Sequence, residues 1–152
     1  MKTHFIQLFD YDRFANKTII DAIISAGAPA PAVRIMAHLL VTQQAWLSRL
    51  KDPGFRVTGS VWPEGNVDGL LTIMEENHQA WLQYLEPLVD KDFSVVLNYF
   101  SIAGAPFSNQ RSDIITHVIN HGTHHRAQAG QELKRAGVEK LPATDYIFYF
   151  RQ

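Results

Sequence analysis

The sequence contains no cysteine. This absence excludes a disulfide framework, a thiolate zinc finger, an iron–sulfur cluster and a cysteine nucleophile. The chain also lacks a charge excess, because 14 Lys and Arg stand against 15 Asp and Glu for a net charge of −1. Proteins that bind duplex nucleic acid through its phosphates carry clustered positive charge, so we expect no nucleic-acid partner.

Long apolar runs are missing as well. The longest uncharged apolar stretch, residues 22–33, contains Gly27, Pro29 and Pro31 and is too short to span a bilayer. Near the start, Asp10 and Asp12 interrupt the sequence before the apolar core of a secretory signal can form. We therefore expect a cytoplasmic protein with no membrane partner.

What the chain does contain is an ordinary globular composition. Its 152 residues are 46% hydrophobic and 19% charged, which predicts a single domain over residues 1–152. Hydrophobic residues recur with helical spacing in four segments. The first three segments cover about residues 5–25, 31–51 and 67–89, and the fourth begins at residue 109 or 112 and ends at about residue 136. They predict an all-α fold, built as a four-helix bundle.

Two further segments do not follow the helical period. Residues 95–100 are rich in β-forming side chains and are followed by Gly104 and Pro106, which predicts a short extended arm or hairpin before the fourth helix. Residues 146–150, Tyr-Ile-Phe-Tyr-Phe, are too apolar to remain in solvent. We expect this C-terminal segment to dock on the bundle as a short helix or strand.

Four histidines lie within nine residues of the last predicted helix: His117, His121, His124 and His125. Residues four apart advance by about 40° around a helix, so His117, His121 and His125 climb one face, and His124 falls within about 20° of His117. Imidazoles at i and i+4 can hold one ion from a single helix. A third ligand then has to come from another helix, and His38, among apolar residues of the second helix, is the candidate.

A simpler explanation is that these histidines are hydrogen-bonded core or surface residues. It accounts for a lone His38 or for an exposed pair, but several inward-facing imidazoles lack enough partners and are costly to charge. A His-Glu-x-x-His protease site is excluded, because Gly122 follows His121. The pattern therefore predicts a metal site.

Three motifs together resemble the DinB-like (DinB/YfiT-like) family of four-helix-bundle metalloproteins. They are Tyr-Asp-Arg-Phe-Ala-Asn at residues 11–16, His38-Leu39-Leu40 with Trp46 and Arg49, and Asn120-His121-x-x-x-His125-Arg126-x-Gln128. The resemblance spans essentially the whole chain. It implies an up-down-down-up bundle, the metal ligands His38, His121 and His125, and a homodimer. It also implies chemistry of the kind known for some members, which are thiol-cofactor-dependent transferases and isomerases.

Residues near the predicted ligands have candidate roles of their own. His117 and His124 share the ligand face, and either one is a candidate catalytic base or a polar residue of the pocket mouth without a chemical role. Trp46 and Gln128 are candidates for contact with a bound cofactor. Both assignments follow from position on the predicted helices alone.

Polar residues also occupy inward positions on the first and third helices. Asp12 and Asn16 lie where a bundle usually has Leu or Ile, and an inward carboxylate can accept the second N–H of a metal-bound imidazole. We predict that both support the ligands in this way, or else form a helix-to-helix hydrogen bond. His78 is either a fourth ligand or a core imidazole. Arg126 points away from the ligand face, so we expect it to anchor the C-terminal tail through Asp145 or a carbonyl.

Three neutral imidazoles leave a divalent ion with an open position, which is typical of catalytic sites, and they suit Zn, Ni and Fe alike. Such an ion can hold a thiol as thiolate. Because the chain has no cysteine, any thiolate has to come from a small molecule. The open three-histidine site and the family resemblance together predict a metal-dependent transferase or isomerase that acts on a small-molecule substrate with a low-molecular-weight thiol cofactor. Two alternatives stay open. One is a hydrolase using metal-bound hydroxide, with His117 or His124 relaying the proton, and the other is a non-catalytic metal-binding protein of the stress response.

Overall fold

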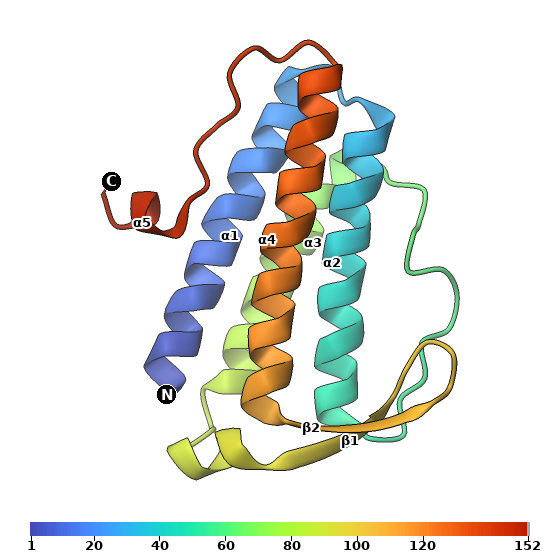
Figure 1. The fold of residues 1–152 in the computed structure, drawn as a ribbon, viewed down its shortest axis with the longest axis vertical. Helices are drawn as coiled ribbons and strands as arrows, with labels where there is room; N and C mark the ends of the chain where they lie inside the picture. The colour runs from blue at the N-terminus through green and yellow to red at the C-terminus, as the bar shows by residue number, and fades with distance from the viewer. Residues whose placement is uncertain (152) are drawn as a thin grey trace.

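The computed structural model describes residues 1–151 and confirms the predicted all-α class. Its elements are α1 (Lys2–Ser25), α2 (Ala30–Lys51), α3 (Val67–Leu85), the 3-10 helix η1 (Asp90–Ser94), β1 (Val96–Phe100), β2 (Pro106–Gln110), α4 (Arg111–Arg135) and α5 (Tyr146–Tyr149) (Figure 1). Among these helices, none combines the length and the hydropathy that crossing a membrane requires.

The four long helices form an up-down-down-up bundle, as the family resemblance implies (Figure 1). A tight turn reverses the chain between α1 and α2. The connection over residues 52–66 then returns along the length of the bundle, so that α3 runs in the same direction as α2, and α4 reverses the chain again (Figure 1). As a result, α3 and α4 each pack against both α1 and α2.

Two helix ends show how local chemistry sets the boundaries. α4 ends at Arg135, and Gly137 follows with a φ of +94°, a left-handed conformation that glycine adopts without steric cost. In contrast, α3 ends at Leu85, before the predicted end at Val89. The nitrogen of Pro87 has no hydrogen to donate to the carbonyl one turn earlier, and its ring clashes with that carbonyl, so the helix stops before it.

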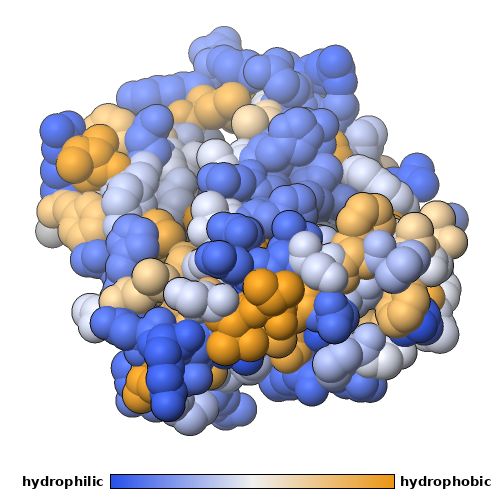
Figure 2. Space-filling view, turned by 60° about the horizontal axis from the view of Figure 1, so that its bottom comes forward, coloured by the Kyte–Doolittle hydropathy of each residue, from blue (hydrophilic) through white to orange (hydrophobic). Residues whose placement is uncertain are grey.

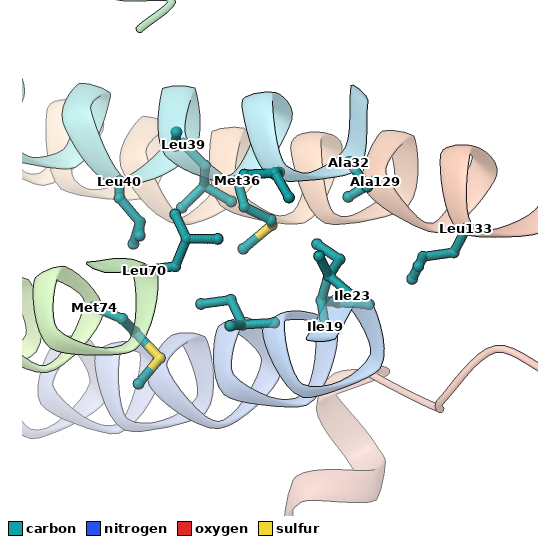
Figure 3. Packing of buried hydrophobic residues seen from close by; sticks show 13 residues of the cluster. Ile19, Ile23, Ala32, Met36, Leu39, Leu40, Leu70, Met74, Ala129 and Leu133 are labelled. Carbon is teal, nitrogen blue, oxygen red and sulfur yellow. The ribbon is translucent and has the colours of Figure 1, made fainter. Parts of the chain in front are cut away.

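Two apolar clusters fill the bundle, one toward each end. Figure 3 shows the first, in which side chains from all four long helices, among them Ile23, Met36 and Leu70, point toward one another. In the second, Phe9 stacks on Trp81 with ring centroids 4.5 Å apart. The buried members of the second cluster are Phe5, Phe9, Leu47, Leu50, Trp81, Leu85, Phe93, Ile114, Ile115, Val118 and Ile119.

Each long helix carries buried polar side chains between its residues of the first cluster and its residues of the second cluster. Together these side chains form a polar layer. Its members are Asp12 and Asn16 of α1, Gln43 of α2, Asn77 of α3 and Arg126 of α4. Asn77 donates to the carbonyl of Leu40 at 2.9 Å and to Oε1 of Gln43 at 3.3 Å. Because buried polar groups need partners, this layer restricts how the helices can be arranged.

The strands β1 and β2 form the hairpin that the sequence predicts before the fourth helix. They pair antiparallel, from Val96 opposite Gln110 to Phe100 opposite Pro106. Figure 2, in which this end of the molecule comes forward, shows apolar side chains gathered among polar ones. The exposed large apolar residues of this part of the chain are Val89, Val95, Val96, Ile102 and Phe107.

The C-terminal segment docks on α1, as predicted, and ends in the short helix α5 (Figure 1). The hydroxyl of Tyr11 donates to the carbonyl of Thr144 at 2.8 Å. The ring of Tyr11 also meets Tyr146 edge-on, with centroids 4.9 Å apart. Aromatic packing and one hydrogen bond therefore attach the tail to the bundle.

Adjacent isoleucines of α1 offer a matched test of this packing. Ile23 is fully buried in the first apolar cluster, whereas Ile24 is 47% exposed. We expect Ile23→Ala to lower the free energy of unfolding by about 2–5 kcal/mol, because it removes buried methyl groups and leaves a cavity. Ile24→Ala removes the same atoms from the surface and should cost less than about 1 kcal/mol. Urea denaturation measures both, and equal losses would contradict this assignment of the core.

Candidate metal centre

The fold brings His38 of α2 together with His121 and His125 of α4. One ring nitrogen of each residue can serve as a ligand, and these three nitrogen atoms lie within 4.8 Å of one another. The Nε2 atoms of His121 and His125 are 3.0 Å apart, and the ring centroids of His38 and His125 are 4.6 Å apart. The predicted grouping across two helices is therefore present.

Hydrogen bonds decide which ring nitrogen is protonated in two of these histidines. Nδ1–H of His38 donates to the carbonyl of Val61 at 2.6 Å, since a carbonyl oxygen can only accept. Nδ1–H of His125 donates to Oε1 of Gln128 at 2.7 Å. Both bonds leave Nε2 unprotonated, which is the usual state of a metal-ligating histidine whose other nitrogen is hydrogen-bonded.

The surroundings hold the imidazoles neutral. Burial lowers the pKa of His121 to about 3, with smaller contributions from the neighbouring His125 and His38. Burial also lowers the pKa of His38 and of His125, although the hydrogen bonds to Val61 and Gln128 oppose the shift. Neutral imidazole is the form that ligates a metal, so the site is prepared for a cation.

The long loop between α2 and α3 adds two contacts that the sequence analysis missed. The indole of Trp62 stacks on the ring of His38, with centroids 3.6 Å apart and planes 3° apart. The preceding residue, Val61, supplies the carbonyl that holds Nδ1 of His38. The available sequence signal was a tryptophan in an aperiodic loop, which does not reveal its partner.

This donor set fits a divalent transition-metal ion. Bonds of about 2.0–2.1 Å from zinc to nitrogen place two ligands of one ion roughly 3 Å apart, and the Nε2 atoms of His121 and His125 are 3.0 Å apart. Two unprotonated nitrogens at that separation repel each other unless a proton or a cation lies between them. Three imidazoles also leave at least one coordination position open.

Asp12 and Asn16 face the interior, as predicted, but their hydrogen bonds do not go to the ligand histidines. Asp12 accepts from Asn16 at 2.8 Å and from Gln43 at 2.6 Å, and it forms an ion pair with Arg126. Arg126 donates to Asn16 at 2.8 Å as well. Of the two predicted roles, the hydrogen bond between helices is present, and the support of an imidazole by Asp12 is not. A buried carboxylate needs a charged partner, and the oxygens of Val61 and Gln128 hold the histidines instead.

The expectation that Arg126 anchors the C-terminal tail through Asp145 or a carbonyl is wrong, because its partners are side chains of α1 and α4. Arg126 is only 2% exposed, and besides Asp12 its guanidinium reaches Thr123, whose Oγ1 accepts from Nη2 at 3.0 Å. This ion pair explains Gly122, because a Cβ there would lie 2.7 Å from Oδ1 of Asp12 and 3.0 Å from Nη1 of Arg126. A side chain at position 122 would displace the pair.

A pocket of about 330 Å³ opens beside the three histidines. His38 and His121 line it, together with His117 and Trp46, whose rings are 5.1 Å apart. The ring centroids of His117 and His121 are 5.8 Å apart. Desolvation by the surrounding protein, with the charge of Arg49, lowers the pKa of His117. His117 is therefore neutral at neutral pH and able to accept a proton.

The other candidate residues lie outside this pocket. His124 is exposed, and its Nε2 is 3.0 Å from the amide nitrogen of Gln128. Gln128 thus bridges His124 and His125, a position suited to orienting a ligand rather than to touching a cofactor. The Nε2 of His78 pairs with Oδ1 of Asp10 at 2.8 Å. His78 does not belong to the three-histidine group, which favours a core imidazole over a fourth ligand.

Comparison with known families agrees with this geometry. The model of the DinB family matches residues 1–152, the whole chain. The chain belongs to the DinB family. Comparison with curated proteins and with solved structures gave no match. Membership and the three-histidine group together fit a metal-binding protein.

Removal of a ligand from either helix should release metal from this DinB protein. We expect His38→Ala and His125→Ala each to lower the bound metal at least about tenfold, because each removes one of three nitrogen donors. Elemental analysis of the purified proteins measures the loss. His124→Ala is the control, since this residue is adjacent to His125 but exposed, and it should retain metal. Full retention in His38→Ala would contradict a site shared between α2 and α4.

The metal-free DinB protein should lose stability as the pH falls from about 6.5 to about 3. The pKa of His121 is about 3 in the folded state and near 6.5 in the unfolded chain. Between these values the unfolded chain binds the proton and is favoured, so stability decreases with falling pH. The Tm measured across this range should fall less in His121→Gln, which does not titrate. The same slope in both proteins would show that His121 is not held neutral.

Proposed function

We propose that this DinB protein is a metal-dependent transferase, or an isomerase, that uses a small-molecule thiol. The observation that carries the proposal is a group of three neutral imidazoles, two of which, His38 and His121, line a pocket of about 330 Å³, in a chain without cysteine. Structural zinc sites are normally closed by four protein ligands, whereas three ligands with an open position are typical of catalysis. The thiol-dependent chemistry implied by the family resemblance fits this arrangement.

A divalent ion held by the three histidines would lower the pKa of a thiol or a water at its remaining position. The chain's own residues prepare the site for this ion. Val61 and Gln128 hold the Nδ1 hydrogens of two histidines, so that the Nε2 lone pairs remain free. Trp62 covers one face of His38 and keeps solvent from that side of the ring.

His117 is the proposed base. In the transfer step, the sulfur of the thiol forms a bond to an electrophilic carbon, and the bond from that carbon to the leaving group breaks. The thiol proton passes to a base, and His117 is neutral and lines the pocket. Proton transfer by a positioned side chain contributes roughly a hundred- to ten-thousandfold to such rates.

Hydrolysis is the second candidate function, and the position of His117 favours it equally. A neutral imidazole that lines the pocket 5.8 Å from the His121 ring can accept a proton from water as well as from a thiol. The two functions differ in their need for a thiol. The pocket beside the histidines counts against the third alternative, a non-catalytic metal-binding protein of the stress response, because such a protein needs no room for a small molecule.

Activity assays with the metal-loaded protein test the proposal. A panel of thiols (cysteine, N-acetylcysteine, glutathione and coenzyme A) is combined with the electrophile 1-chloro-2,4-dinitrobenzene, and thioether formation is followed by absorbance. We expect turnover with at least one thiol, its loss on chelation and in His38→Ala, and a decrease of about a hundredfold or more in kcat in His117→Ala. His4→Ala, an exposed histidine of α1, is the control and should keep full activity.

Two outcomes would contradict a thiol-dependent enzyme. Ester or amide cleavage in thiol-free buffer that disappears on chelation would establish the hydrolytic function instead. Failure of the whole thiol panel to bind or react, in protein with full metal content, would reject the transferase.

A further inference from the structure

One stripe of α2 carries polar side chains into the pocket beside the three histidines. His38, Thr42, Trp46 and Arg49 follow one another at helical spacing, and all four line the pocket. His38 belongs to the three-histidine group and Trp46 forms a wall. Thr42 has no part in the chemistry described above, and Arg49 contributes only its charge, which helps to lower the pKa of His117.

Arg49 is a buried cation that has no acidic partner among residues 1–151. It is 6% exposed, and its Nε has no hydrogen-bond partner within the described residues. In residues 1–151 its guanidinium makes no hydrogen bond and no ion pair, and it lies over the ring of Trp46, 4.6 Å from the centroid. Arg126, which is equally buried, has the carboxylate of Asp12 and the amide oxygen of Asn16. Because burying an unpaired charge is costly, Arg49 requires an explanation.

Thr42 is a second buried polar group without a partner. Thr18, Thr116 and Thr123 each donate to the carbonyl four residues earlier, the common bond for a helical threonine. Oγ1 of Thr42 makes no such bond, and it is buried without a partner in the described part of the chain. Two groups without partners on one stripe therefore face the same pocket.

Two polar side chains of this region do not pair with Arg49 within residues 1–151. The hydroxyl of Tyr99, which also lines the pocket, donates to Oδ1 of Asn109 at 2.8 Å. Asp113 lines an adjoining hollow with Trp46 and Tyr99, but among residues 1–151 it forms no ion pair with Arg49. Among the described residues the guanidinium thus has no polar partner, and it is available to a ligand in the pocket.

Apart from Ser101 and the histidines, the remaining lining is mostly apolar. Ile102 and Phe107 of the hairpin segment and Val61 of the long loop complete the wall with Trp46 and Tyr99, whose rings are 5.1 Å apart. A volume of about 330 Å³ is at the lower end of the range for small-molecule sites. The pocket suits a small molecule with an apolar body and a charged group at one end.

We infer that this pocket binds a small organic carboxylate, with the carboxylate on Arg49 and the apolar body along Trp46 toward Thr42 and the three histidines. A guanidinium presents two N–H groups in a fork that matches the two oxygens of a carboxylate. One positive charge balances one negative charge, whereas a dianionic phosphate would leave a charge unbalanced among apolar side chains. The assignment of this carboxylate as the substrate of the enzyme rests on the proposed function, whereas its binding to Arg49 needs no metal.

Calorimetric titration with 3-phenylpropanoate and its neutral amide, 3-phenylpropanamide, tests the inference on metal-free and metal-loaded protein. At pH 7.5 the carboxylate should bind about ten- to a hundredfold more tightly than the amide, because the amide loses the charged hydrogen bonds. Arg49→Met keeps the apolar stem and should abolish this preference. Arg34→Met removes the same charge from an exposed position of α2 and should leave the preference unchanged.

Three outcomes would overturn the inference. The first is equal affinity of the native protein for the acid and the amide, a comparison that needs no variant and decides the matter even if Arg49→Met does not fold. The second is an unchanged preference in Arg49→Met with a native circular dichroism spectrum. The third is tighter binding of phenylphosphonate than of 3-phenylpropanoate, which would exclude a site built for a single negative charge.

Metal content measured on the same samples separates this inference from the proposed function. Full metal content without any preference for the carboxylate would reject the inference and leave the metal-dependent enzyme standing. A preference for the carboxylate in protein that retains no metal would support the site at Arg49 and reject the proposed enzyme.

Discussion

The buried ion pair between Asp12 and Arg126 determines how α4 is rotated within the bundle. Arg126 directly follows His125, and consecutive residues of a helix are turned by about 100°. With Arg126 held toward α1 by Asp12 and Asn16, His125 has to face α2, where His38 lies. The apolar clusters cannot supply this constraint alone, because hydrophobic contact is not directional. The ion pair, and the glycine that makes room for it, thus position the histidines without touching them.

The electrostatics of the site follow from the burial of its histidines and of Arg49 in a pocket whose described lining contains no acidic residue. His38, His121 and His125 are kept neutral by desolvation, so a cation can enter without displacing protons near neutral pH. Arg49 stays charged but has no counter-ion from the described residues. The three histidines are therefore suited to a metal cation with open coordination positions, and Arg49 is suited to a small organic anion beside it. The chain's single buried pair of full charges, among residues 1–151, lies deeper in the bundle and leaves the pocket free for both.

Much of the fold and part of the site were predictable because they depend on local patterns. Helical periodicity predicted the four long helices, and turn chemistry predicted the stop after α4 at Gly137. The spacing of His121 and His125 predicted that they share a face, and the apolar neighbours of His38 indicated that it points inward. The partner of Arg126 was mispredicted, because angular position on one helix does not reveal which neighbouring helix supplies the opposite charge.

The amino-acid sequence by itself determined the helical class, the hairpin, the docking of the tail and the residue types available for a metal site. These properties follow from period, composition and chain stiffness, which act over a few residues. Only the tertiary structure decided that Val61 and Trp62 hold His38. It also decided that Oγ1 of Thr42 and Nε of Arg49 are buried without a hydrogen-bond partner among the described residues. The physical reason is that a hydrogen bond or an ion pair needs two groups within about 3 Å. That distance depends on the path of a loop and the rotation of packed helices, which no single segment encodes.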